Sequence, residues 1–110
     1  MTIRTAVLAS TSFNAGVTVT LFTVPAGQTW IVKDVLVHNW AAGNNQIRVR
    51  MVDPVSLTYL YLIDVPATDP GRKEWQGWMT LVAGQYMDVW SPNNAGYIWV
   101  AGSKLSGIAA

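Results

Sequence analysis

Acidic side chains are the first candidates for chemistry in this chain, because two carboxylates alone can hydrolyse a glycosidic bond. The acidic residues are Asp34, Asp53, Asp64, Asp69, Glu74 and Asp88. Asp53 and Asp69 each precede a proline, which is typical of turns in which the carboxylate caps nearby backbone. A carbohydrate-active enzyme would draw on Asp64, Asp69, Glu74 and Asp88, but nothing in their spacing marks an acid and base pair. We therefore predict no catalytic residue.

A metal site or a nucleophile finds equally little support. Asp64 and Asp69 could bracket a metal-binding loop, but hard cations need more oxygen ligands than this loop offers, so turn capping is favoured. His38 is the only histidine, and no nucleophile or carboxylate is patterned around it. The absence of cysteine excludes a disulfide and a thiol nucleophile. The sequence thus predicts no metal and no cofactor, and a structural or strand-end role for His38.

Tryptophan carries the strongest signal, since the chain has 6 Trp, more than the core of a small sandwich needs. Trp75 and Trp78 are an odd number of positions apart, so they face opposite sides of a strand unless Gly77 marks a bulge. We expect at least one of them outside the core. Indole suits both protein interfaces and stacking on sugar rings, and the interface is favoured because a sugar site would add polar groups beside the rings. The interface candidates are Trp40, Tyr59, Tyr61, Trp75, Trp78 and Trp90.

The segments that must position these residues have apolar side chains at every second position, the pattern of β-strands. Turn-forming Gly, Pro and Asn residues separate the segments, and no stretch predicts a helix. The predicted strands are Thr5–Ser10, Val17–Val24, Thr29–Asn39, Gln46–Val52, Leu57–Ile63, Lys73–Val82, Tyr86–Trp90 and Tyr97–Gly102. The sequence therefore predicts an all-β fold, an antiparallel β-sandwich that is jelly-roll-like with about eight strands.

A single domain suits the 110 residues, because no linker or low-complexity segment divides them. We expect residues 1–16 to form an N-terminal arm or first strand, and residues 17–110 to form the β-sandwich. Two turns echo each other, Ala26-Gly27-Gln28 and Ala83-Gly84-Gln85, as expected of the paired corners of a jelly roll. No apolar run approaches the roughly 18–20 residues of a membrane span, so no membrane partner is predicted.

Charge is scarce in this chain. Only 12% of residues are charged, against about 25% in an average globular protein, and a net charge of +1 argues against a nucleic-acid partner. The segment Leu57–Ile63 is apolar on both faces, so one face needs the core and the other a neighbouring subunit. We predict a closed homo-oligomer, specifically a trimer. The charged rim around its contacts is expected to consist of Arg48, Arg50, Arg72, Lys73 and Glu74.

Three segments of the chain carry a recognisable pattern of turns and strands. Leu21–Asn39 has a Val-Pro-Ala-Gly turn followed by a long strand, Glu74–Gln85 has an aromatic-rich strand before a glycine turn, and Tyr97–Ser103 forms the last strand. In these three segments the chain resembles small β-sandwich structural proteins of tailed bacteriophages. The second corner departs from the pattern, because Ala83-Gly84-Gln85 stands where these proteins have Pro-Gly-Asp.

The resemblance implies a trimeric virion component that has no catalytic residues and assembles in the host cytoplasm. Its partners would be the major capsid protein or other virion proteins. As a head decoration (cementing) protein it would stabilise the capsid by adding buried area between subunits. The alternative is a tail, baseplate or fibre module whose Trp40, Trp75 or Trp78 stacks on a receptor glycan. The small carbohydrate-active enzyme is the third hypothesis.

Overall fold

The computed structural model describes residues 2–39, 45–67, 71–92 and 95–106, and these residues form strands and turns. The eight strands are β1 (Thr2–Phe13), β2 (Val19–Thr23), β3 (Gln28–Asn39), β4 (Asn45–Asp53), β5 (Thr58–Ala67), β6 (Gly71–Val82), β7 (Tyr86–Trp90) and β8 (Gly96–Ser106). Each predicted segment overlaps one of these strands, so the predicted all-β class is confirmed. Among the described residues, no helix is long and apolar enough to cross a membrane.

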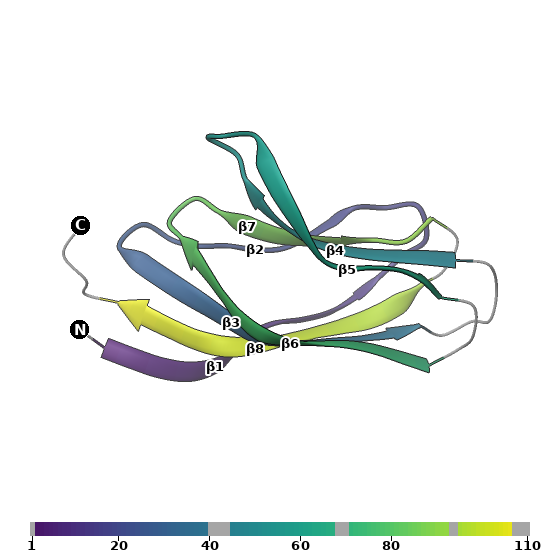
Figure 1. The fold of residues 1–110 in the computed structure, drawn as a ribbon. Coiled ribbons are helices and arrows are strands. Elements are labelled where there is room, and N and C mark those ends of the chain that lie inside the picture. The colour runs from purple at the N-terminus through teal and green to yellow at the C-terminus, as the bar shows by residue number, and fades with distance from the viewer. Residues whose placement is uncertain (1, 40–44, 68–70, 93–94, 107–110) are drawn as a thin grey trace.

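The strands pair in the order of one long hairpin, the first with the last and so on inward, and they lie in two layers (Figure 1). Antiparallel pairs join β1 to β8, β2 to β7, β3 to β6 and β4 to β5. Pairing of β3 with β8 and of β4 with β7 then completes two four-stranded sheets. Their orders, β1-β8-β3-β6 and β2-β7-β4-β5, give the β-sandwich of the jelly-roll type that the sequence predicts.

The core fills the space between the two sheets. Side chains that alternate along the strands, such as Val35 and Val37 of β3 and Val49 of β4, are fully buried there. Branched aliphatic side chains of this kind pack well on a pleated surface. The alternating positions of the same strands face outward, and these outward positions carry the candidate functional residues.

The two echoing turns lie side by side and are hydrogen-bonded to each other. The Val24 N–H donates to the Gln85 carbonyl at 2.9 Å, and the Gly84 N–H donates to the Val24 carbonyl at 2.9 Å. Gly27 and Gly84 have φ angles of 76° and 89°, which glycine adopts without a steric penalty. The repeat in the sequence thus corresponds to a contact between the β2–β3 and β6–β7 turns.

Trp75 and Trp78 of β6 lie in different environments. The register between β3 and β6 shifts between Val32 and Asp34, opposite Gly77 and Trp78. Trp75 packs against the core, whereas Trp78 is 65% exposed. A Cβ on Gly77 would lie 2.8 Å from the Trp75 ring, so glycine leaves room for the indole. The prediction that at least one of the two Trp residues lies outside the core is confirmed.

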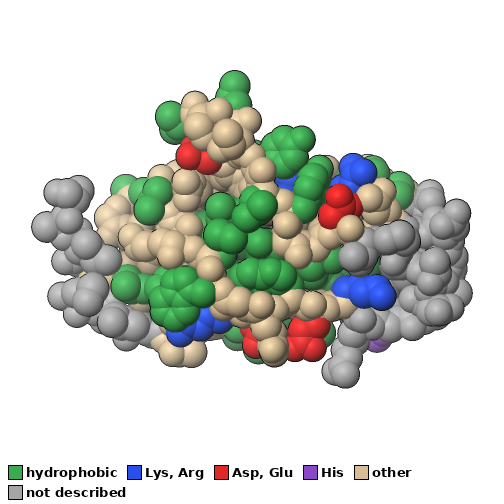
Figure 2. All heavy atoms as spheres, in the orientation of Figure 1, with side chains coloured by type: hydrophobic (Ala, Val, Ile, Leu, Met, Phe, Trp, Pro, Cys, Tyr) green, Lys and Arg blue, Asp and Glu red, His purple; other side chains and the backbone are tan. Residues whose placement is uncertain are grey.

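The β4–β5 hairpin projects from the body of the sandwich (Figure 1). The predicted strand start at Leu57 is wrong, because β5 begins at Thr58 and Leu57 lies in the turn with a φ of 57°. The Asp53 carboxylate accepts the Val55 N–H at 2.9 Å and holds the chain in this turn, as the capping prediction for Asp53 expected. Val55 and Leu57 are 91% and 83% exposed, and Figure 2 shows hydrophobic side chains at the hairpin tip.

Candidate functional site

Charged and aromatic side chains gather on the outer face of the β2-β7-β4-β5 sheet. Ile47 and Val49 of β4 point into the core, so the alternate residues Arg48 and Arg50 point outward. Neighbouring outward positions on β5 and β7 complete the group. We call this group the arginine–aromatic cluster: Arg48, Arg50, Tyr59, Tyr61, Asp64, Asp88 and Trp90.

Arg50 and Asp88 form the most buried part of the cluster. They are direct cross-strand neighbours on β4 and β7, and Arg50 Nε donates to both carboxylate oxygens, at 2.9 and 3.1 Å. Asp88 is only 3% exposed, so its charge depends on this partner for compensation. The hydrogen bond to Asp88 raises the pKa of Arg50 above its ordinary value.

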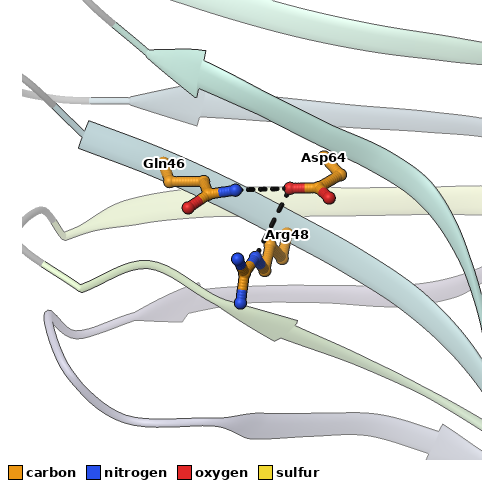
Figure 3. Close-up of polar contacts among 3 residues, drawn as sticks. All are labelled: Gln46, Arg48 and Asp64. Atoms are coloured by element: carbon orange, nitrogen blue, oxygen red, sulfur yellow. Dashed lines mark hydrogen bonds and ion pairs between the residues drawn. The ribbon is translucent and has the colours of Figure 1, made fainter.

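Arg48 is held by an acidic partner and by two rings. The register sets it between Asp64 of β5 and Trp90 of β7. Arg48 Nε donates to Asp64 at 3.4 Å, and the same carboxylate oxygen accepts from the Gln46 amide at 2.6 Å (Figure 3). The guanidinium lies 5.2 Å from the Trp90 ring centroid and 5.7 Å from that of Tyr61, within cation–π range.

A second stacking contact extends the cluster toward the hairpin. The Arg50 guanidinium lies 5.4 Å from the centroid of the Tyr59 ring, and Tyr59 and Tyr61 pack edge to face at 5.4 Å. Two arginines are therefore fixed by rings and carboxylates in defined orientations. Planar guanidinium groups fixed in this way are suited to bidentate recognition of carboxylates.

The cluster surrounds a hollow of about 190 Å³ on the surface of the sheet. It is lined by Thr18, Arg48, Arg50, Tyr61, Asp88 and Trp90. The lining combines hydrogen-bond donors, a hydroxyl group and aromatic walls, the composition expected of a small polar binding site.

The acidic residues considered for catalysis are not assembled into a pair. Asp64 and Asp88 are each held by a different arginine, and Glu74 is on β6 of the opposite sheet. Asp69 lies outside the described residues. His38 is exposed at the end of β3. No group of three or more potential metal ligands occurs among the residues whose structure is described.

The predicted interface residues are distributed over both sheets. Tyr59, Tyr61 and Trp90 belong to the arginine–aromatic cluster, whereas Trp75 and Trp78 belong to β6 of the other sheet. The Lys33 ammonium lies 5.0 Å from the ring centroid of the exposed Trp78. Trp40 lies outside the described residues. A role in subunit contacts stays a prediction for each of these residues.

The predicted charged rim is divided between the sheets. Arg48 and Arg50 lie on the outer face of β4 among aromatic rings, whereas Lys73 and Glu74 are exposed on the edge strand β6. The side chain of Arg72 lies outside the described part of the chain. The arginines of β4 are thus within a cluster of their own, and a continuous rim stays a prediction.

Sequence analysis missed two exposed aromatic residues on β8, Tyr97 and Trp99. Both belong to the β1-β8-β3-β6 sheet, and their neighbours Ile98 and Val100 are fully buried in the core. Strict alternation between these four residues is the signal that could have identified them, since it sends both rings outward. Val7, opposite Ala101 in the β1–β8 pairing, adds a further exposed apolar side chain to this sheet.

The fold and the surface define an antiparallel jelly-roll sandwich that carries an arginine–aromatic cluster on one outer face. No family model matches the chain, and no curated protein matches it. Solved structures with the same fold include a protein of the T13 viral particle of infectious bursal disease virus, with a TM-score of 0.61 and 9% identity. This match covers 96% of the present chain and 31% of the viral one.

Two further solved structures extend the comparison. The Drosophila NLP core, whose structure concerns pentamer formation and histone binding, has a TM-score of 0.56 and 15% identity, with 92% of this chain and 100% of that chain covered. A pentameric capsid protein from metagenomic phage sequences has a TM-score of 0.51 and 18% identity, covering 86% of this chain and 61% of that one. At these identities the likeness establishes a shared fold.

Proposed function

We propose that this chain is a non-enzymatic structural subunit of a virus particle. The observation that carries the proposal is the jelly-roll strand order, combined with large apolar side chains that stay exposed in the single chain. Jelly rolls are a common architecture of capsid proteins, and two of the solved structures compared above come from a viral particle and a phage capsid. Exposed apolar patches mark surfaces that other protein covers.

Within that role, we propose a bacteriophage capsid decoration (cementing) protein that binds the major capsid protein in the virion. The small size, the low charge and the apolar hairpin tip suit a subunit that adds buried area at joints of a shell. The test compares the temperature at which particles with and without the protein release DNA. A higher release temperature with the protein supports the proposal. Equal temperatures, together with no binding to particles, contradict it.

The same surfaces support a closed homo-oligomer. Val55 and Leu57 at the hairpin tip and Tyr97 and Trp99 on the other sheet are exposed in the single chain, and a closed ring covers such residues without open-ended growth. Sequence analysis predicts three subunits, whereas the pentameric structures of the same fold support five. The mass in solution counts the subunits, and a stable monomer at micromolar concentration contradicts the ring.

A second candidate function is glycan binding by a tail, baseplate or fibre module. The hollow lined by Tyr61, Trp90 and the two arginines favours it, because sugar sites join aromatic rings to polar hydrogen-bonding groups. A glycan array with the intact chain tests the function. Binding that is lost in Trp90→Ala and kept in Trp78→Ala supports glycan recognition at the hollow, whereas no binding to any glycan contradicts this candidate.

A further inference from the structure

We propose that the hollow on the β2-β7-β4-β5 sheet binds one acidic sugar unit, with its carboxylate on the two guanidinium groups and its ring against Tyr61 and Trp90. The proposal rests on the second candidate function, glycan binding, and specifies its site and ligand class.

Each guanidinium group in the lining is paired through its Nε with one carboxylate. Arg48 pairs with Asp64 beside the hollow and Arg50 pairs with Asp88 in its lining, so these four charges sum to zero. Asp88 is buried, and both of its carboxylate oxygens accept from Nε of Arg50, so within the described part of the chain this carboxylate does not engage the terminal nitrogens of that guanidinium. This balanced site has no surplus charge for a phosphate group, which carries about −1.5 to −2 at neutral pH, whereas the planar guanidinium groups match the geometry and single charge of a carboxylate.

The guanidinium groups are organised before a ligand arrives. Trp90 and Tyr61 flank Arg48 through cation–π contacts, and Asp64 holds its Nε while Gln46 holds Asp64 in turn (Figure 3). Arg50 is fixed by the buried Asp88 carboxylate. A fixed planar fork loses little conformational freedom when it binds a carboxylate, which favours affinity.

The size of the hollow limits the ligand to about one ring. Its volume of about 190 Å³ is smaller than the roughly 300–1,000 Å³ of sites for drug-sized ligands. Tyr61 and Trp90 offer apolar walls for the C–H groups of a sugar, and the Thr18 hydroxyl offers a partner for a sugar hydroxyl.

The position of the hollow in the sheet disfavours a peptide ligand. It lies over β4 and β7, and each of these strands is already paired on both sides. A peptide therefore cannot add its backbone to either strand, which is a common way for a sheet to recognise an extended segment. Recognition must come from side chains alone, and a compact, ring-shaped acid fits them best.

The test is an NMR titration of the full chain with three probes: a trisaccharide of galacturonic acid, the neutral trisaccharide of galactose and a tripeptide of glutamic acid. We expect the acidic trisaccharide to shift the Trp90 indole N–H signal in a saturable way. The neutral trisaccharide lacks the carboxylate, and the glutamate tripeptide lacks the sugar ring. Each should therefore bind at least about tenfold more weakly, the first because it loses the charge-assisted bidentate contact and the second because it loses the contact with the aromatic rings.

Variants locate the contact and separate it from folding. Arg50→Lys and Arg48→Lys keep the charge but remove the planar fork, and each should weaken the acidic trisaccharide by about tenfold. If Arg50→Lys fails to fold, Arg48→Lys carries the test alone, since Arg48 is not the partner of the buried Asp88. Lys73→Gln, an exposed change on the opposite sheet, is the matched control and should leave affinity unchanged.

Four other results would contradict the proposal, and each rejects a different part of it. Equal binding of the neutral trisaccharide rejects the carboxylate contact but keeps glycan binding. Equal or tighter binding of the glutamate tripeptide rejects a sugar in favour of an acidic peptide. Sugar binding that ignores both arginine variants rejects this site, and the absence of binding on a full glycan array rejects the glycan function as a whole.

Discussion

Asp88 shows most clearly how one residue constrains the rest of the surface. A carboxylate that is 3% exposed is stable only with a partner, and Arg50 is the charged residue that the β4–β7 register brings opposite it. The same ion pair orients a guanidinium toward the hollow. The stability of the fold and the proposed binding at the hollow therefore both depend on one cross-strand contact.

Removal of one partner of this pair should cost more than removal of both. Breaking a buried pair costs about 3–5 kcal/mol, and since Arg50 is partly exposed we expect about 2 kcal/mol for Arg50→Gln. The double variant Arg50→Gln with Asp88→Asn removes both charges and should recover about half of that loss. Urea unfolding of the four proteins measures the coupling, and strictly additive effects would contradict the account.

Gly77 lies directly beside the Trp75 indole. A methyl group there would lie 2.8 Å from the Trp75 indole, so Gly77→Ala should destabilise the fold by about 1–3 kcal/mol through overpacking. The indole is the cause, so the same change in a Trp75→Leu background should cost less than half as much. Thermal unfolding of both pairs is the measurement, and an equal cost in the two backgrounds would show that the ring is not responsible.

The β4–β5 hairpin is the element in which local strain and exposure coincide. Leu57 is a bulky residue with a positive φ, and it is 83% exposed at the tip of a projecting hairpin. A bulky residue in this conformation lowers the stability of the single chain, so we expect its exposed apolar side chain to have a use outside that chain. Contact with another subunit is the use that the proposed assembly provides.

Leu57→Asn should therefore separate stability from assembly. Asn tolerates the left-handed conformation, so we expect the isolated subunit to gain up to about 1 kcal/mol. The oligomer should weaken because an apolar contact is lost at the tip. Unfolding measures the stability of the variant, and sedimentation of the same sample measures its oligomeric state. A variant that is more stable and equally oligomeric would show that the hairpin tip is not part of the interface.

Asp53 gives the hairpin base a pH dependence. Its pKa lies below the ordinary value of 3.8 because the carboxylate accepts hydrogen bonds from the Val55 N–H and the Gln85 side chain. The contribution of this residue to stability is therefore complete above the ordinary pKa, and it is lost as the pH falls through the lowered folded value.

The matching measurement compares Asp53→Asn with the native chain by urea unfolding between about pH 6 and about pH 2. The native chain should be more stable at the upper end of this range, and the difference should shrink toward the acid end. A difference that stays constant with pH would mean that the ionised carboxylate does not stabilise the turn.

The positions of the strands could be predicted from the sequence, whereas the side-chain pairs between strands could not. Alternating side chains and Gly turns locate the eight strands, and the odd spacing of Trp75 and Trp78 separates the two indoles. The pairing of Arg50 with Asp88 across 38 positions depends on long-range register, which local patterns do not contain. The hollow was missed for the same reason, because it exists only after β4, β5 and β7 are aligned.

Scarce charge and exposed apolar residues both fit the proposed role as a subunit of a shell. Only 12% of residues are charged, and two of the arginines are used within the cluster by carboxylates and rings. Exposed apolar side chains occur at the hairpin tip and on the outer face of the opposite sheet. A subunit covered by its neighbours in a shell needs few surface charges, whereas an isolated soluble domain would expose these patches to water.

Imaging of a virus particle at a resolution that identifies this chain is the decisive test of the proposed virion role. We expect the chain in purified particles in many symmetry-related copies, with the β4–β5 hairpin tip buried against protein. A position on the shell would support the decoration role, and a ring on the tail axis would support the tail alternative. Absence of the chain from purified particles would contradict the virion role altogether.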